Sequence, residues 1–225
     1  MNRTALIIGA SRGLGLGIVE RLTERGWQVT ATVRNSMSVE LLRQTGATVE
    51  ILEMNDLAQI EALGLQMRKE CFDLILVNAG VLGPVGDLRI AFDEQILGQL
   101  FLTNSLAPVV LAKTLAHQLR PGTGVLAFMS SRMGSVANPD GTDMALYKAS
   151  KAALNSLVNS LVSAWEGPAT TFLCLHPGWV KTDLGGDDGD IDVWTSTSGV
   201  VDQVMHHAGH GGLHFVDYAG EPVSW

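Results

Sequence analysis

The sequence has few cysteines, few aromatic residues and no long apolar run. Its 225 residues include 2 cysteines, and aromatic residues make up 6%. Cys71 and Cys174 lie far apart without metal-type spacing, which excludes a disulfide framework and predicts free thiols in a reducing compartment. No apolar stretch approaches the roughly 20 residues needed to span a bilayer. The first apolar run, 5–8, is too short for a signal-peptide core. These absences predict a cytoplasmic protein with no membrane partner.

Positive charge is also scarce. The chain has 15 Lys and Arg against 23 Asp and Glu, for a net charge of -8. Nucleic-acid binding needs clustered Lys and Arg, so we expect no nucleic-acid partner. The length and a hydrophobic content of 46% predict one well-buried core, and therefore a single domain over 1–225.

Short apolar runs alternate with helical patterns along the chain. This alternation is typical of an α/β protein with a buried parallel sheet. The runs that we predict to be strands are 5–8, 28–33, 48–52, 73–77, 125–129, 170–175 and 213–216. The predicted helices include 39–44, a helix from Asp56 through Lys69, 93–119 with an interruption at Pro108, 149–164 and 200–208. The polar, acidic stretch 183–199 predicts a mobile surface loop.

A glycine-rich turn joins the first strand to the first helix. It reads Gly9-x-x-x-Gly13-x-Gly15 and includes Ser11 and Leu14. Glycines allow close approach of the backbone to a pyrophosphate, and the amides at a helix N-terminus favour its negative charge. The alternative is an ordinary strand-to-helix turn. The strand before it and the helix after it favour dinucleotide binding.

Two arginines indicate which dinucleotide. Arg34 ends the second predicted strand, where an acidic residue would hydrogen-bond the ribose of NAD, and Arg12 lies in the glycine turn. Arginine at such a place suits a 2'-phosphate, so NADP(H) is favoured over NAD(H), although each arginine alone could be a solvated surface charge. Asp56, followed by Leu57, is predicted to cap the next helix. Its carboxylate is also within reach of a bound adenine.

Tyr147 and Lys151 are four residues apart at the start of a predicted helix. Residues at this spacing lie on one face, so the ammonium can lie beneath the phenol. A neighbouring cation favours the phenolate and lowers the phenol pKa from about 10 toward neutrality, as a catalytic acid requires. The alternative is a helix-surface pair.

Two further residues lie at special places in the predicted fold. Ser131 follows the fifth strand, on the side where ligands bind in open α/β sheets. Pro108 has no N–H and therefore frees the carbonyl of Asn104, four residues earlier.

Together these features resemble the classical short-chain dehydrogenase/reductase family, and specifically its small carbonyl-reductase-like members. The resemblance covers nearly the whole chain. It depends on six matched elements in the family's order: Gly9-x-x-x-Gly13-x-Gly15, Asn78-Ala79-Gly80, Asn104, Ser131, Tyr147-x-x-x-Lys151 and Pro177-Gly178-x-Val180-x-Thr182. It implies a Rossmann-like, doubly wound sheet of about seven parallel strands with helices on both faces.

The resemblance also implies a role for each matched residue. Tyr147 would donate the proton, Ser131 would hold the substrate oxygen, and Lys151 would lower the phenol pKa and hold the nicotinamide ribose. The Asn104 carbonyl would bind a water that passes protons through Lys151. The residues expected to bind the cofactor are Gly9, Ser11, Arg12, Gly13, Leu14, Gly15, Arg34, Asp56, Leu57, Asn78, Ala79, Gly80, Tyr147, Lys151, Pro177, Gly178, Val180 and Thr182.

Some features depart from the family pattern or stay outside it. Ser135 is a rival to Ser131, and the short acidic segment 183–190 stands where many relatives carry a longer insertion, which predicts an open pocket. Four histidines near the C-terminus suggest a metal, but glycines break any helix that would hold them, so we expect no metal site. These histidines are His206, His207, His210 and His214. His176 is interpreted as a core or rim histidine.

Two functions follow from this reading. The first is an NADPH-dependent oxidoreductase that reduces a ketone or aldehyde to an alcohol. The second is a dinucleotide-binding regulatory or signalling protein of the same fold with little turnover. The intact set of Ser131, Tyr147, Lys151 and Asn104 favours the enzyme. The family resemblance also implies a homodimer or homotetramer formed through the helices that carry Asn104 and Tyr147.

Overall fold

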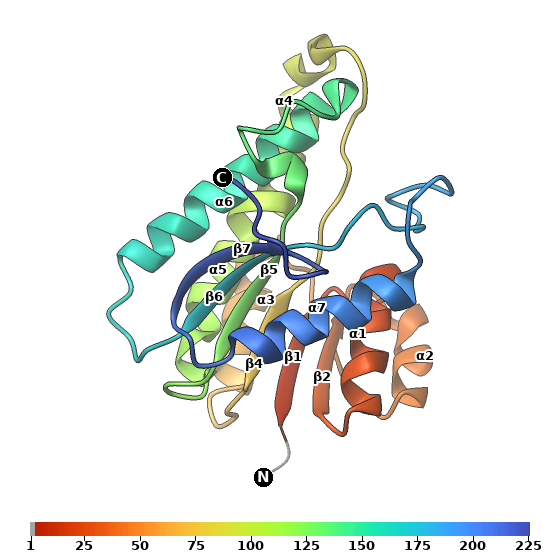
Figure 1. Cartoon of the computed structure of the whole chain (residues 1–225). Helices are drawn as coiled ribbons and strands as arrows, with labels where there is room; N and C mark the ends of the chain where they lie inside the picture. Colours follow the sequence, from red (N-terminus) through yellow and green to blue (C-terminus); the bar gives the residue numbers. More distant parts are fainter. Residues whose placement is uncertain (1–2) are drawn as a thin grey trace.

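A computed structural model describes residues 3–225, apart from the side chains of residues 90 and 91, and shows a parallel sheet flanked by helices (Figure 1). Within these residues the sheet has seven strands in the order β3-β2-β1-β4-β5-β6-β7. Every neighbouring pair is parallel. The strands are β1 (Thr4–Ile8), β2 (Gln28–Val33), β3 (Thr48–Ile51), β4 (Leu74–Val77), β5 (Val125–Met129), β6 (Thr171–His176) and β7 (Gly212–Asp217). This confirms the predicted fold class.

Helices cover both faces of the sheet because successive strand residues point to opposite sides. In β1, Ala5 and Ile7 join one buried cluster while Leu6 and Ile8 join the other. The first cluster contains residues of α1 (Gly13–Glu24), α2 (Val39–Gln44) and α7 (Val193–His207). The second contains residues of α3 (Leu57–Gln66), α5 (Ala107–Leu115) and α6 (Ala145–Ser163). The fold is therefore doubly wound, as predicted.

The interruption expected at Pro108 is a π-helical segment. The helical run consists of α4 (Glu94–Phe101), the π-helical η3 (Leu102–Leu106), α5 and the short 3-10 turn η4 (Ala116–Gln118). Pro108 stands in the first turn of α5. It has no N–H for the carbonyl of Asn104 four residues earlier, which is the physical reason for a break in the α-helical pattern here. The remaining 3-10 turns are η1 (Ser36–Ser38), η2 (Leu88–Phe92), η5 (Arg132–Gly134) and η6 (Thr142–Met144).

The same helical run is apolar overall, although polar residues interrupt every apolar stretch in it. By length and composition Glu94–Gln118 could cross a membrane, with a mean hydropathy of 1.4. In the fold, 44% of its most apolar window is buried, and Leu111 and Leu115 of α5 belong to the core cluster on one face of the sheet. A buried core helix of a globular protein can have the same length and hydropathy as a membrane-spanning helix.

Two helices begin earlier than the sequence pattern predicted. α6 begins at Ala145 rather than 149, so Tyr147 lies within its first turn. α7 begins at Val193 rather than 200, so the predicted loop 183–199 is wrong over its second half. Asp192 caps α7 by accepting a hydrogen bond from the Thr195 amide. Polar residues of this turn are buried, and the Ser196 hydroxyl donates to the carbonyl of Pro177, which apolar periodicity cannot reveal.

Asp73 ties the beginnings of three strands together. Its carboxylate accepts hydrogen bonds from the amide of Thr4 at 2.9 Å and from Nε of Arg120 at 2.6 Å, while its own backbone carbonyl accepts from the amide of Val125. Burial acts to raise the pKa of this carboxyl, but the hydrogen bonds from Arg120 and Thr4 outweigh it and hold the pKa below its ordinary value. The ionised form is therefore the one that stabilises the fold.

We predict that Asp73→Asn lowers the free energy of unfolding by about 1 to 3 kcal/mol near neutral pH, because it removes charge-assisted hydrogen bonds. A depressed pKa contributes stability above the unfolded value, about 3.9, and that stability is lost as pH falls. The difference from the unchanged chain should therefore shrink in acid. Urea denaturation at neutral and acidic pH measures it. Asp202→Asn, which removes the exposed partner of Arg25, is the control and should change stability little.

Candidate active site

A large open cavity lies at the carboxyl ends of the strands. Its volume is about 1060 Å³, which exceeds the usual size of a pocket for a single drug-sized ligand. It spans the place where the strand order reverses between β1 and β4, the usual ligand site of a doubly wound sheet. The predicted site residues that line it are Gly9, Ser11, Arg12, Gly13, Leu14, Arg34, Asn78, Ala79, Gly80, Ser131, Tyr147, Lys151, Pro177, Gly178, Val180 and Thr182.

The glycine turn is shaped by close backbone approaches. Gly9 has a φ of 83°, and a Cβ there would lie 2.7 Å from the Cβ of Ala79. A Cβ on Gly15 would lie 2.1 Å from the carbonyl oxygen of Gly9, so Gly15 packs the start of α1 onto β1 and does not line the cavity. Asn78 fastens the turn by donating from Nδ2 to the Gly9 carbonyl at 2.8 Å. The turn thus presents the N-terminus of α1 to the cavity.

Arg12 of this turn and Arg34 after β2 also line the cavity, both with exposed side chains. Nη1 of Arg12 donates to Oδ2 of Asp183 at 2.7 Å, across the mouth of the cavity. Asp56 caps α3, accepting from the amides of Ala58 and Gln59, as its capping prediction requires.

Neither Asp56 nor Leu57 lines the cavity, so their placement gives no support to a contact with adenine. Leu57 is exposed. Glu53, Met54 and Asn55, the residues between β3 and the cap, line the cavity instead. The sequence pattern predicted where β3 ends, but it did not predict that the residues directly after β3 line the cavity.

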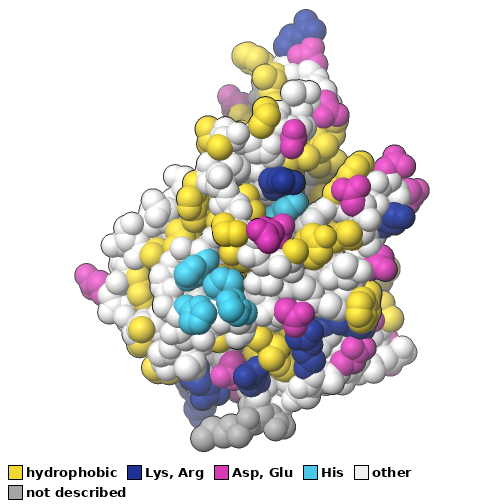
Figure 2. Space-filling model, viewed as in Figure 1, with side chains coloured by type: hydrophobic (Ala, Val, Ile, Leu, Met, Phe, Trp, Pro, Cys, Tyr) yellow, Lys and Arg dark blue, Asp and Glu magenta, His cyan; other side chains and the backbone are white. Residues whose placement is uncertain are grey.

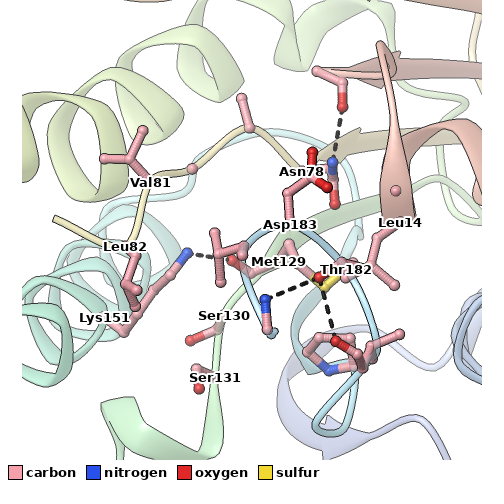
Figure 3. A pocket seen from close by; sticks show the side chains of 18 of the residues that line it. Leu14, Asn78, Val81, Leu82, Met129, Ser130, Ser131, Lys151, Thr182 and Asp183 are labelled. Carbon is pink, nitrogen blue, oxygen red and sulfur yellow. Dashed lines mark hydrogen bonds between the residues drawn. The ribbon is translucent and has the colours of Figure 1, made fainter. Parts of the chain in front are cut away.

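Tyr147 and Lys151 are buried on the face of α6 that meets the cavity. Nζ of Lys151 donates to the carbonyl of Met129 at 2.8 Å and lies 5.8 Å from the centre of the Tyr147 ring. Figure 3 shows the lysine reaching toward Met129, with Ser130 and Ser131 following along the chain. The expected pair shares one face with the ammonium over the phenol ring, while the hydrogen bond of the ammonium goes to the end of β5.

The pKa of Tyr147 is shifted opposite to our expectation. Burial raises it to about 12, and a hydrogen bond with Ser131 opposes the shift only in part. Burial also lowers the pKa of Lys151 to about 8. The phenol is therefore a protonated hydroxyl at neutral pH, and the lysine titrates close to neutrality. This arrangement suits a proton donor better than a standing base.

The geometry separates the two rival serines. Ser131 lines the cavity together with Tyr147, and its hydroxyl acts to lower the pKa of that phenol. Ser135 does not line the cavity, and its hydroxyl donates to the carbonyl of Trp225 at 3.3 Å. The hydroxyl of Ser130 donates to Asn155 of α6 at 2.6 Å, which anchors the strand end that carries Ser131.

Asn104 is fully buried in the π-helical segment and does not line the cavity. Its amide group accepts from the amide of Val81 at 2.8 Å, donates to the carbonyl of Val81 at 2.8 Å and donates to the hydroxyl of Ser150 at 3.0 Å. A Cβ on Gly80 would lie 3.3 Å from Oδ1 of Asn104 and 3.5 Å from Nζ of Lys151, so these two side chains converge on that glycine. The side chain thus fastens the loop after β4 to α6.

The segment after β6 forms an ordered turn rather than a featureless loop. Thr182 Oγ1 accepts from the amide of Gly185 at 3.0 Å, and the indole of Trp179 donates to the carbonyl of Gly185 at 2.7 Å. An isolated bridge also joins Val180 to Ile191. A Cβ on Gly13 would lie 3.6 Å from Cγ2 of Thr182, so this segment faces the glycine turn.

No sequence motif identifies the residues that shape the other end of the cavity. They are Val81, Leu82, Met133, Met144, Trp179, Leu184 and Tyr218, together with His176. Burial lowers the pKa of His176 to about 4, so its ring is neutral at physiological pH. Among the described residues its buried Nδ1 has no hydrogen-bond partner. Only the meeting of distant loops identifies these residues, because most are apolar and lie outside any motif.

The four C-terminal histidines gather on one face of the molecule (Figure 2). Their rings meet edge-on or tilted, with centroids 4.9 Å apart for His206 and His207 and 5.0 Å apart for His207 and His214. Ring nitrogens of His207 and His214 contact the carbonyls of Gln203 and Gly211. Over residues 3–225, no group of three His, Cys, Asp or Glu side chains is arranged to hold a metal ion.

Known proteins resemble this chain in both sequence and fold. Residues 3–191 match the short chain dehydrogenase family model. A carbonyl reductase from Pseudomonas aeruginosa PAO1, solved in complex with NADP, is 40% identical with a TM-score of 0.91 over 100% of both chains. A protein described as a short-chain dehydrogenase/reductase from Burkholderia multivorans, with bound NADP, is 33% identical with a TM-score of 0.94 over 100% of both chains. The C-signal protein of Myxococcus xanthus is 37% identical over 68% of this chain and 92% of its own length. The chain therefore belongs to the short-chain dehydrogenase family.

Proposed function

We propose that this protein is an NADPH-dependent reductase that converts a ketone or aldehyde to an alcohol. The observation that carries the proposal is the meeting of Ser131, Tyr147 and Lys151 in one cavity, whose other end is the glycine turn with Arg12 and Arg34. Two family members similar to this chain were solved with NADP. A pocket that joins a proton donor to a phosphate-binding turn is what hydride transfer to a carbonyl requires.

The residues present fit a dinucleotide. The backbone approaches at Gly9 and Gly15 leave the N-terminus of α1 free of bulky side chains, and the first turn of α1 contains no acidic residue that would repel a pyrophosphate. Arg34 and Arg12 would hold a 2'-phosphate, and Asn78, Ala79 and Gly80 would flank the middle of the cofactor. Pro177, Gly178, Val180 and Thr182 would hold the carboxamide end.

The chain's own groups would supply placement and protons. When bound, NADPH supplies the hydride that adds to the carbonyl carbon. Ser131 would hold the carbonyl oxygen beside the Tyr147 hydroxyl, and Tyr147 would give its proton to that oxygen as the alcohol forms. Lys151, held by Met129, would hold the nicotinamide ribose and restore the proton of Tyr147. The backbone carbonyl of Asn104, which Pro108 cannot engage because it has no N–H, would lead that proton in from water.

Apolar side chains dominate the substrate end. Met133, Met144 and Trp179 line it, and Trp179 is half exposed. These contacts favour an apolar carbonyl compound with loose selectivity, which a screen of ketones, aldehydes and quinones with NADPH would identify. Assembly into a homodimer or homotetramer through the helices that carry Asn104 and Tyr147 stays a prediction.

A second function keeps the cofactor site without turnover. The similarity to the C-signal protein of Myxococcus xanthus supports a regulatory or signalling role that depends on dinucleotide binding. NADPH binding without reduction of any compound in the screen would favour this alternative over the enzyme.

We predict that Tyr147→Phe lowers the turnover of carbonyl reduction by a factor of about 10² to 10⁴, because it removes the proton donor. NADPH affinity should change little. Initial rates of NADPH oxidation and fluorescence titration of NADPH measure the two effects. Tyr218→Phe is the matched control, since Tyr218 also lines the cavity but has no proposed proton role. Persistent turnover in Tyr147→Phe would show that the proton comes from another group.

We predict that Arg34→Asp shifts the ratio of kcat/KM for NADPH over NADH toward NADH by at least about tenfold, because a charge-assisted contact with the 2'-phosphate becomes a repulsion. Arg43→Asp reverses a charge on α2, outside the cavity, and should leave the ratio near its starting value. An unchanged ratio in Arg34→Asp would remove Arg34 from cofactor selection.

We predict that the kcat/KM for reduction is level below about pH 7 and declines above about pH 8, because Lys151, whose pKa burial lowers to about 8, then loses its proton. The phenol, with its pKa raised to about 12, stays protonated throughout. Lys151→Arg should move the decline to higher pH in the activity that remains, since guanidinium does not titrate in this range. A decline at the same pH in both proteins would assign it to another group.

A further inference from the structure

The Arg12 guanidinium is already engaged by a carboxylate at the mouth of the cavity. Its Nη1 lies 2.7 Å from Oδ2 of Asp183, and both residues line the cavity. The pair joins the glycine turn after β1 to the turn after β6, segments 171 residues apart in the chain. The ion pair therefore spans the region where the cofactor phosphates would lie.

The turn that carries Asp183 is fixed by its own hydrogen bonds. The amides of Gly185 and Gly186 donate to Oγ1 and to the carbonyl of Thr182, at 3.0 and 2.8 Å. The amide of Lys181 donates to the carbonyl of Ile191 at 3.0 Å, which closes the base of the turn. Because the backbone on both sides of Asp183 is fastened, its carboxylate stays within reach of Arg12 rather than dispersing in solvent.

The pair is weak enough to be displaced. The side chains of Arg12 and Asp183 are 72% and 70% exposed, and ion pairs at such exposure are screened by water and salt. A phosphate monoester carries more negative charge than a carboxylate and offers three acceptor oxygens to the planar guanidinium. It can therefore take Arg12 from Asp183, but at a cost in affinity.

We propose that Asp183 competes with the 2'-phosphate of NADP(H) for Arg12 and thereby limits how strongly this chain prefers NADP(H) over NAD(H). The inference rests on the proposed function, because it needs the dinucleotide to bind along the glycine turn. NAD(H) has no 2'-phosphate and leaves the ion pair in place. Asp183 is thus a specificity-determining residue: by holding Arg12, it lowers the affinity for the 2'-phosphate of NADP(H).

Asp183→Asn tests the proposal through equilibrium binding. Calorimetric titration with NADPH, NADH and adenosine 2',5'-bisphosphate should show binding about twofold to fivefold tighter for the two 2'-phosphates, the range expected for release of an exposed ion pair. NADH affinity should stay constant. Asp183→Glu, which keeps the charge, should resemble the unchanged chain. Asp188→Asn, on the same acidic segment but not lining the cavity, controls for the loss of one negative charge.

A double-mutant cycle separates competition from simple repulsion. In an Arg12→Ala background, Asp183→Asn should no longer tighten NADPH binding, because no guanidinium remains to be released. The proposal would be overturned if Asp183→Asn tightened NADPH binding equally in the Arg12→Ala background. It would also be overturned if Asp188→Asn tightened NADPH binding as much as Asp183→Asn does. If the unchanged chain binds NADPH and Asp183→Asn binds it with the same affinity, the proposal is overturned, but the proposed function stays intact. Absence of NADPH binding by the unchanged chain would overturn both.

Discussion

The site depends on a buried ammonium held at the end of a strand. Lys151 donates to the carbonyl of Met129, and this contact joins α6 to the last residue of β5. A buried charge is costly unless it is hydrogen-bonded, so the contact fixes the rotation of α6 as well as the position of the ammonium. With α6 fixed, Tyr147, one helical turn before Lys151, lines the same cavity as Ser131. Polar contacts from Asn104 to Ser150 and from Ser130 to Asn155 support the same face of α6.

The two ends of the cavity are built by different physical means. At the glycine turn, backbone atoms approach so closely that Gly9 and Gly15 have no room for a side chain, and the backbone itself forms the surface. Elsewhere in the cavity, side chains from separate loops form the wall, including Met133 and Trp179. Backbone surfaces suit a cofactor shared by a whole family, whereas side-chain walls can vary from one member to another.

Several details departed from the sequence prediction because they depend on contacts between distant segments. The pKa of Tyr147 was expected to fall because of a nearby cation, yet burial against the sheet raises it. α7 begins before its apolar pattern, with Asp192 as its cap, and its first turns carry buried polar residues such as Ser196, which donates to the carbonyl of Pro177, a bond that no local pattern reveals. Asp56 was correctly predicted as a cap because capping is local. Its contact with adenine depended on the direction of the chain after β3, and other residues there line the cavity.

The sequence by itself determined the order of strands and helices, the glycine turn and the spacing of Tyr147 and Lys151, because each depends on residues near one another in the chain. The structure then divides each strand between two cores, since successive side chains point to opposite faces of the sheet. Only the tertiary structure placed Ser131, and not Ser135, on the cavity wall and brought Asp183 onto Arg12. Those pairings join segments far apart in sequence, and they exist only once the sheet has aligned the strand ends at one edge.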